Sequence, residues 1–419
     1  MMTTSDLNSI YLDQAEGLTK STSYLKPAKE EALSFFKKLG LPHKKLDSWK
    51  YSRIEKRIPS TLVLNKTAEV NKLAGDLIYP DADLIVLVNG NFSSELSKIS
   101  SSLSYQYEKE SNKAYDDLQI DPSDAFDNLS LLLTEGTHTI TLKDNEVLTK
   151  PIQVIHLNEG NSESTITSRF HFEAGKFSKA TMIEMHLGNG NNTDYGYSTF
   201  SLSDGANIEH IKIGMNNSDS THVGKVSAKL KKDSTFHSFT LCLGGGLVRN
   251  HVKTNLVESG AHAEVNGLYA LQGEHRSDNY TEIHHNASHT TSGQLFKGIL
   301  ADSSRGIFTG RVFIHRDAQK VDANQLNKNL LLSKEARIDT RPQLEVYADD
   351  VKCAHGATIG QLNEEELFYL QARGIPKQEA YEMLMAAFSE DALMKVTNPT
   401  TKKWLADFLD DHFEKTRKK

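Results

Sequence analysis

The pattern of hydrophobic and polar positions changes twice along the chain and so divides it into three regions. In the first region, apolar residues recur at helical spacing between Pro27 and Gly40, which predicts an amphipathic helix with a defined end. A continuous aliphatic run over residues 84–88 predicts a buried strand, and Asp124 is placed to cap a further helix. We therefore expect a mixed α/β region over residues 1–136.

The second region, residues 137–360, consists of many short alternating segments separated by small and polar residues. This pattern is typical of an all-β array. A similar local sequence introduces several of the expected strands: DGANI at 204–208, KDSTF at 232–236, SGAHA at 259–263 and KEARI at 334–338. Ala206 and Ser234 are 28 residues apart, and Ser234 and Ala261 are 27 apart.

A period of this size fits one coil of a parallel β-helix, in which each coil buries its inward side chains by stacking on the next. A β-sandwich would instead show regular two-residue hairpin turns, which are not systematic here. We therefore expect a mainly β protein with a parallel β-helix core.

The third region, residues 361–419, returns to helical spacing. Asn363 is placed to cap one helix, and Pro376 opens a second. Apolar residues line one face of the second and third helices: Tyr381, Leu384 and Phe388 on the second, and Leu405, Phe408, Leu409 and Phe413 on the third.

Composition narrows the classes of function. The chain has 419 residues, 38% hydrophobic and 25% charged, with a mean hydropathy of −0.48 and a net charge of −7. We expect a cytoplasmic protein, because the first residues are polar and acidic rather than a secretory signal. No aliphatic run is long enough to span a membrane, and no basic stripe suggests nucleic acid, so we expect neither partner.

The two cysteines, Cys242 and Cys353, exclude a disulfide framework and a self-contained four-cysteine metal site. Cys353 and His355 are two positions apart in a segment that reads as extended, so their side chains project to the same side with Cα atoms about 6.6 Å apart. A thiolate and an imidazole on one face can bind a metal, or the imidazole can lower the pKa of the thiol. The alternative is a packed thiol beside a hydrogen-bonded histidine.

Other candidate residues have simpler explanations. Cys242 lies in a segment of alternating apolar residues, so we expect its thiol to pack as an apolar group, although it could face a partner. Adjacent His284 and His285 point to opposite faces of a strand, so they and His289 do not form a recognisable metal motif.

Six motifs lie in order in the last third of the sequence. They are GQLFKGIL at 293–300, FTGRV at 308–312, AQKVDA at 318–323, NLLLS at 329–333, DDVKCAHGA at 349–357 and LFYLQARG at 367–374. Together they resemble the SufB/SufD family of the Suf iron–sulfur cluster assembly system. Weaker resemblance extends back to about residue 120, and KLDSWKY at 45–51 resembles the N-terminal segment of the SufD type.

The SufB type has a glutamate after the Cys-x-His motif and more cysteines, whereas this chain has Gly356 there and two cysteines in all. The resemblance is therefore closer to the SufD type. It implies a right-handed parallel β-helix, a heterodimer with a SufB-like paralogue, and two copies of the ABC-type ATPase SufC. Iron–sulfur acceptor proteins would be indirect partners.

The resemblance also implies roles for individual residues. His355, followed by Cys353, would contribute to a cluster-assembly interface, with His355 as a candidate metal ligand. The cluster would be transient and shared with the partner chain, and reduced FAD would belong to the whole complex, although no flavin motif is visible here. The C-terminal residues Tyr381, Leu384, Phe388, Leu405 and Phe408 would dock the ATPase; otherwise they cap the end of the β-helix.

We expect a non-catalytic scaffold subunit. Two other functions fit a β-helix: a carbohydrate-active enzyme, which would need paired carboxylates along a groove, and a SufB-like chain that holds a cluster by itself.

Overall fold

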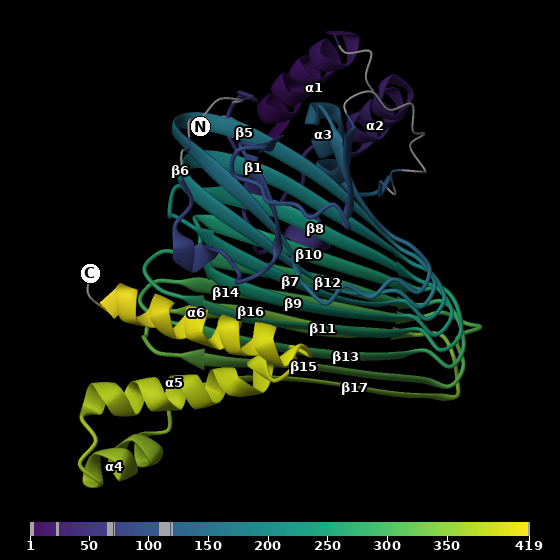
Figure 1. Cartoon of the computed structure of the whole chain (residues 1–419). Helices are drawn as coiled ribbons and strands as arrows, with labels where there is room; N and C mark the ends of the chain where they lie inside the picture. Colours follow the sequence, from purple (N-terminus) through teal and green to yellow (C-terminus); the bar gives the residue numbers. More distant parts are fainter. Residues whose placement is uncertain are drawn as a thin grey trace.

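The chain forms a parallel β-helix with helices attached at both ends of the sequence, as the computed structural model shows (Figure 1). The structure describes residues 4–21, 25–64, 70, 72–108, 118 and 120–417. Within that part, no helix combines the length and the apolar character needed to cross a membrane. The expected mainly β class, with an α/β region before the coils and helices after them, is confirmed.

Two parallel sheets make up the β-helix, and we call them sheet one and sheet two. Sheet one contains β1 (Asp83–Val88), the first parts of β5 (Ile152–Ala174) and β6 (Lys179–Leu202), then β7 (Asn207–Asn216), β9 (Thr235–Gly244), β11 (His262–Leu271), β13 (Thr291–Leu300), β15 (Val321–Leu331) and β17 (Val351–Gly360). Sheet two contains β4 (Thr137–Leu142), the second parts of β5 and β6, then β8 (Thr221–Leu230), β10 (Leu247–Leu256), β12 (Arg276–His285), β14 (Arg305–Ile314) and β16 (Arg337–Val346).

The coils stack with their strands in register. Partners on sheet one are 27 to 31 residues apart, as the series Asn207, Thr235, His262, Thr291 and Asp322 shows. The sequence period is therefore the length of a coil. It becomes irregular because later coils differ in loop length and not in register.

Three of the four recurring sequence patterns, at 204–208, 232–236 and 259–263, lie at turns that enter sheet one, whereas KEARI at 334–338 enters β16 of sheet two. The turns into sheet one contain a residue in the left-handed region: Phe177, Gly205, Asp233, Gly260, His289 and Lys320. The turns are also joined to one another, since the backbone N–H of Gly205 donates to Lys232 O (2.9 Å) and that of Asp233 to Ser259 O (3.1 Å). The turns therefore extend the hydrogen-bond ladder of the strands.

The interior of the β-helix is apolar over most of its length. Its largest residues include Phe172, Phe200, Phe236, Phe296 and Phe308, all nearly or completely buried. β1, which the sequence placed in the first region, belongs to this structure, because it pairs in parallel with β5 from Asp83↔Ile152 to Val88↔Leu157. Chain segments before residue 137 thus build part of the first coil.

The N-terminal helices are α1 (Thr4–Ser21), α2 (Lys26–Leu39) and α3 (Ala125–Leu133), with 3₁₀ turns at Asp47–Trp49, Ile54–Lys56 and Gly75–Leu77 and antiparallel strands β2 (Asn91–Phe92) and β3 (Ser104–Glu108) between them. The predicted cap of α3 is confirmed, because Asp124 accepts from the backbone N–H groups of Phe126 and Asp127. Lys225 from sheet two forms ion pairs with Asp121 (3.1 Å) and Asp124 (3.2 Å) at this helix start. The helices are thereby attached to the outer face of sheet two.

The C-terminal helices are α4 (Glu364–Ala372), α5 (Lys377–Leu393) and α6 (Pro399–Arg417). α6 lies against the strands of sheet one, while α4 and the start of α5 project away from them (Figure 1). Leu405 and Leu409 of α6 pack against the outer side chains of sheet one, including Ile183 and Ile211. α6 therefore covers a face of the β-helix and not its open end.

Candidate functional site

The last coil of the β-helix is covered on one side only. β17 pairs with β15 and β16 pairs with β14, and in the described part of the chain no further parallel strand follows either one. Every residue of β16 and β17 is at least partly exposed, whereas most of β14 is buried. The coil therefore ends in two edge strands whose outward backbone groups are available for pairing.

Cys353 and His355 lie on the inward side of this last coil. Their register partners on β15 are Ala323 and Gln325, which are 0% and 3% exposed inside the β-helix. The predicted common face of Cys353 and His355 is thus confirmed by the register. Because no coil covers β17, the same inward positions are half-buried at Cys353 and exposed at His355.

The chemistry of this pair is that of a neutral thiol and an accessible imidazole. Partial burial raises the pKa of Cys353, and the charge of Asp322 acts in the same direction. Among the described residues, neither Cys353 nor His355 belongs to a group of three metal-ligating side chains. The edge therefore offers single ligand atoms and not a complete site.

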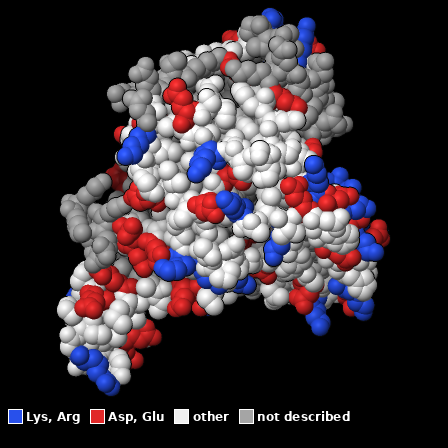
Figure 2. All heavy atoms as spheres, viewed as in Figure 1, with Lys and Arg blue, Asp and Glu red and all other residues white. Residues whose placement is uncertain are grey.

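A groove of about 680 Å³ runs along the outer face of sheet one next to this edge. His262, Glu264 and Lys395 line it, together with residues 354–356 of the edge strand. Lys395 Nζ lies 3.4 Å from Glu264 Oε2, so the groove carries paired charges. Acidic and basic side chains are interspersed over the face of the molecule shown in Figure 2, with no large area of one sign.

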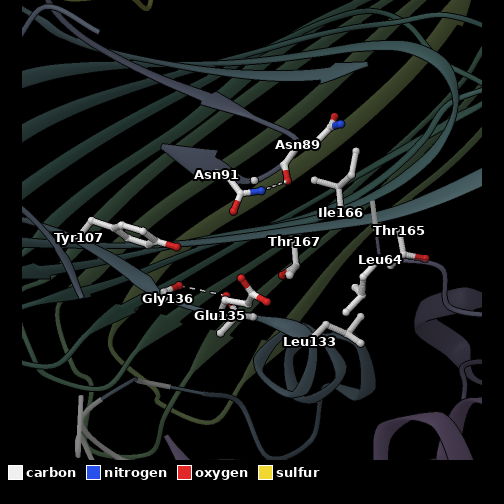
Figure 3. A pocket seen from close by; sticks show the side chains of 12 residues that line it. Leu64, Asn89, Asn91, Tyr107, Leu133, Glu135, Gly136, Thr165, Ile166 and Thr167 are labelled. Carbon is white, nitrogen blue, oxygen red and sulfur yellow. Dashed lines mark hydrogen bonds between the residues drawn. The ribbon is translucent and has the colours of Figure 1, made fainter. Parts of the chain in front are cut away.

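A second pocket lies at the corner between α3 and β5 and is drawn in Figure 3. It is small, about 40 Å³, and Leu133, Ile166 and Tyr107 are among the residues that line it. Asn91 donates to Asn89 O (3.1 Å), and Thr134 donates to Gly136 O (3.1 Å). These polar groups hold the local backbone, so we assign this pocket no chemistry.

The first coils contain a buried polar group that the sequence analysis did not find. We call it the interior cluster: His156, Glu184, His186, Asp194, His210 and His222, each at most 2% exposed. Glu184 Oε2 lies 2.9 Å from His210 Nε2, and Asp194 Oδ2 lies 3.0 Å from His186 Nδ1 and 2.9 Å from His222 Nδ1. The cluster therefore joins sheet one to sheet two across the interior.

The two carboxylates of the interior cluster are held in the charged form. Burial opposes this charge, but the imidazoles around them keep the pKa of Glu184 and Asp194 well below the usual range. Burial lowers the pKa of His222 to about 3, and Lys212 adds to this effect. Burial and Lys212 also disfavour the charged form of His186, yet the carboxylates raise its pKa.

One signal in the sequence could have revealed the cluster. Asp194 and His222 are 28 residues apart, which is one coil, and Glu184 and His186 are two positions apart on one strand. Residues at the coil period share a column, so histidines and acids at that spacing are expected to meet inside.

The predicted docking residues differ in burial: one is fully buried against sheet one, and the others are half-buried. Leu405 is completely buried against sheet one, and Phe408 is half-buried beside it. Tyr381, Leu384 and Phe388 on α5 are half-buried. The most exposed aromatic side chains of this region are on α4, where Phe368 is 71% and Tyr369 58% exposed.

The remaining candidates are placed as their alternation predicted. Cys242 is completely buried in the interior, and burial raises the pKa of its thiol. His285 points inward and is bonded to Thr290 and Ser292, while His284 lies half-buried on the opposite face. His289 is an exposed turn residue.

Comparison with known proteins gives a consistent result. The family model described as "SUF system FeS cluster assembly, SufBD core domain" matches residues 156–388. The iron–sulfur cluster assembly protein SufD of Escherichia coli is 30% identical, over 91% of this chain and 90% of its own. An iron–sulfur cluster assembly SufBD family protein of Synechocystis is 27% identical over 89% of this chain and 88% of its own.

SufD of Bacillus subtilis is 25% identical over 67% of this chain and 65% of its own. The family model covers more than half of the chain, and the Escherichia coli relative covers nearly all of it. The chain therefore belongs to the SufB/SufD family of iron–sulfur cluster assembly proteins and, within that family, is similar to SufD.

Proposed function

We propose that this chain is a SufD-like, non-catalytic scaffold subunit that supports iron–sulfur cluster assembly together with a SufB-like paralogue and a SufC-like ATPase. The observation that carries the proposal is the uncovered last coil, which presents Cys353 and His355 on its inward side. The family relationship supplies the system in which such an edge would work.

The edge suits pairing with a second β-helix. β16 and β17 are ten-residue strands in register with the coil before them, so a partner strand could continue either sheet through backbone hydrogen bonds. Pairing would cover the inward positions of the last coil. Cys353 and His355 would then lie in an enclosed space between two chains.

This arrangement explains how a chain with two cysteines can take part in cluster assembly. An iron–sulfur cluster is usually held by four ligands, and this edge offers one thiol and one imidazole. The remaining ligands would come from the SufB-like chain. The cluster is then a transient product at the interface and not a resident group of this subunit.

The ATPase would dock on α4 and α5. Phe368 and Tyr369 expose large aromatic surfaces on α4, and Leu384 and Phe388 line a cavity of about 390 Å³ between α5 and the end of β17. Leu405 contributes indirectly, because it attaches α6, and with it the C-terminal region, to sheet one.

Co-expression with SufB-like and SufC-like chains, followed by isolation through a tag on this chain, tests the complex. We expect a defined assembly of all three.

Ala354→Asp places a charge on the exposed edge strand and should weaken binding of the SufB-like chain by at least tenfold in calorimetry. Ser94→Asp, exposed on the first-coil side of the molecule, is the matched control.

Equal affinity of the Ala354→Asp variant and the parent would refute the edge as the interface. For the ATPase, the double substitution Phe368→Ala and Tyr369→Ala is preferable to removal of residues 361–419, because that truncation would uncover the apolar outer face of sheet one. Undiminished recovery of the ATPase with the double variant would refute docking on α4.

A further inference from the structure

Three inward-facing atoms in the interior cluster lie at the mutual distances of metal ligands. His156 Nε2 is 3.2 Å and His186 Nε2 is 3.1 Å from the same oxygen, Glu184 Oε1. Two ligands of a tetrahedral ion, each about 2.0–2.1 Å from the metal, are roughly 3.3 Å apart. The three atoms are therefore at ligand separations, but the two rings are stacked with planes 8° apart, so one imidazole must turn before both Nε2 lone pairs point at the same ion.

Each of these three side chains also forms a hydrogen bond through its other polar atom, the one that is not a candidate ligand. The partners on the far side are Asp194 Oδ2 for His186 Nδ1 (3.0 Å), Ser168 Oγ for His156 Nδ1 (3.1 Å) and His210 Nε2 for Glu184 Oε2 (2.9 Å). Metal-binding imidazoles usually donate their second N–H to a carboxylate or a similar acceptor, which fixes the ring and its tautomer. All three candidate ligands have this support.

Among the three candidate ligand atoms, the hydrogen-bond network leaves one without a partner. His156 Nε2 is buried and has no hydrogen-bond partner, although it lies 3.2 Å from Glu184 Oε1. A proton on His186 Nε2 can bridge to Glu184, but it does nothing for His156. A buried polar atom without a partner costs about 1–3 kcal/mol, and a metal ion would satisfy all three atoms together.

The strand opposite makes room for these rings. A Cβ atom at Gly196 would lie 2.7 Å from Cε1 of His186, so a larger residue would displace the imidazole. The stacked rings of His156 and His186 have centroids 4.1 Å apart, so both Nε2 atoms lie near Glu184, and a turn of one ring brings both lone pairs toward one ion. Glycine at position 196 therefore leaves the space that the His186 imidazole occupies.

We propose that His156, Glu184 and His186 bind a divalent first-row transition metal ion inside the β-helix. Two imidazoles and one carboxylate suit Zn²⁺, Co²⁺ or Fe²⁺ better than Mg²⁺ or Ca²⁺, which prefer oxygen ligands alone. This site is independent of the cluster-assembly interface proposed above, because it lies in the first coils and is closed to solvent. The ion enters as the coils form and stabilises them.

The test uses Co²⁺ as the probe. The full chain is unfolded with chelator, refolded with excess Co²⁺ and desalted, and the metal content is compared with that of the protein as purified. We expect about one cobalt per chain, visible ligand-field bands without a thiolate charge-transfer band, and X-ray absorption showing nitrogen and oxygen neighbours with two imidazoles. The cobalt-loaded chain should also melt at a higher temperature.

Variants locate the ion. His156→Gln and His186→Gln should each lower the affinity for cobalt tenfold or more. His285→Gln is the matched control, because His285 is equally buried but is bonded to Thr290 and Ser292, and it should retain the metal.

Two results would overturn the site. One is a parent chain that holds no stoichiometric metal either as purified or after refolding, which would mean that protons alone complete the network. The other is metal retained equally by the parent, His156→Gln and His186→Gln. If these variants do not fold, the absorption spectrum of the parent decides: sulfur neighbours or fewer than two imidazoles would exclude the proposed ligands.

Discussion

The first coils and the last coil of the β-helix have polar residues at equivalent inward positions, but only those of the first coils are covered. His210 in the first coils and His355 in the last lie in one column, linked through Ser238, Val265, Gln294 and Gln325 by the strand register. His210 is 0% exposed and bonded to Glu184, whereas His355 is exposed. The same position thus serves internal structure at one end and remains accessible at the other.

The difference follows from how a solenoid buries its side chains. Each coil covers the inward residues of its neighbour, so a coil without a neighbour leaves them open. At the first coils, β1 and the N-terminal segments supply the cover; at the last coil, α6 lies on the outer face of sheet one and leaves the edge free. The open end is therefore a feature of the topology and not of local sequence.

The largest loss of stability should come from a substitution in the interior cluster. Glu184→Ala removes a buried carboxylate and leaves the Nε2 atoms of His186 and His210 without their partner, so we expect a loss of about 3–5 kcal/mol in the free energy of unfolding. Chemical denaturation of the full chain measures it. Glu173→Ala, at an exposed carboxylate 3.3 Å from His171, should change stability by less than about 0.5 kcal/mol. A loss below 1 kcal/mol for Glu184→Ala would show that the cluster contributes little to the closed end.

The next effect separates packing from docking in the C-terminal helices. Leu405→Ala opens a cavity between α6 and sheet one and should cost about 2–5 kcal/mol. Phe368→Ala, at a side chain that is 71% exposed, should leave stability within about 0.5 kcal/mol of the parent. Thermal unfolding distinguishes them. Similar losses for both would mean that α4 packs as firmly as α6.

The stability that Glu282 contributes in a middle coil should depend on pH. Burial opposes the charge of Glu282, but His251, 3.0 Å away, lowers the pKa of this carboxyl from 4.5 to about 2. A depressed pKa gives stability that is present above pH 4.5 and is lost as the pH falls through 2, about 3 kcal/mol in all. Glu282→Gln should therefore flatten the acid limb of the stability profile. A profile unchanged by this substitution would contradict the assignment.

Much of the fold was predictable because it repeats. The alternation and the 27- to 28-residue spacing gave the β-helix, and the two-residue spacing placed Cys353 and His355 on one face. The interior cluster was not found because its members come from β5, β6, β7 and β8 and meet only once the coil register is known. Likewise, a helical stripe shows that Leu405 is apolar but not that sheet one already covers it.

The smallest effect on the isolated chain should be that of His355→Ala. Gln325, its covered neighbour in the column, hydrogen-bonds to Gln294, so Gln325→Ala leaves a buried group unpaired and should cost about 1–3 kcal/mol. His355→Ala removes an exposed side chain and should cost less than about 0.5 kcal/mol. In a complementation assay with the SufB-like and SufC-like partners present, His355→Ala should lower cluster assembly more than Cys242→Ala, because Cys242 packs inside whereas His355 would ligate iron at the proposed subunit boundary. Parental activity of the His355→Ala variant would remove His355 from the proposed interface and leave the open end without its chemistry.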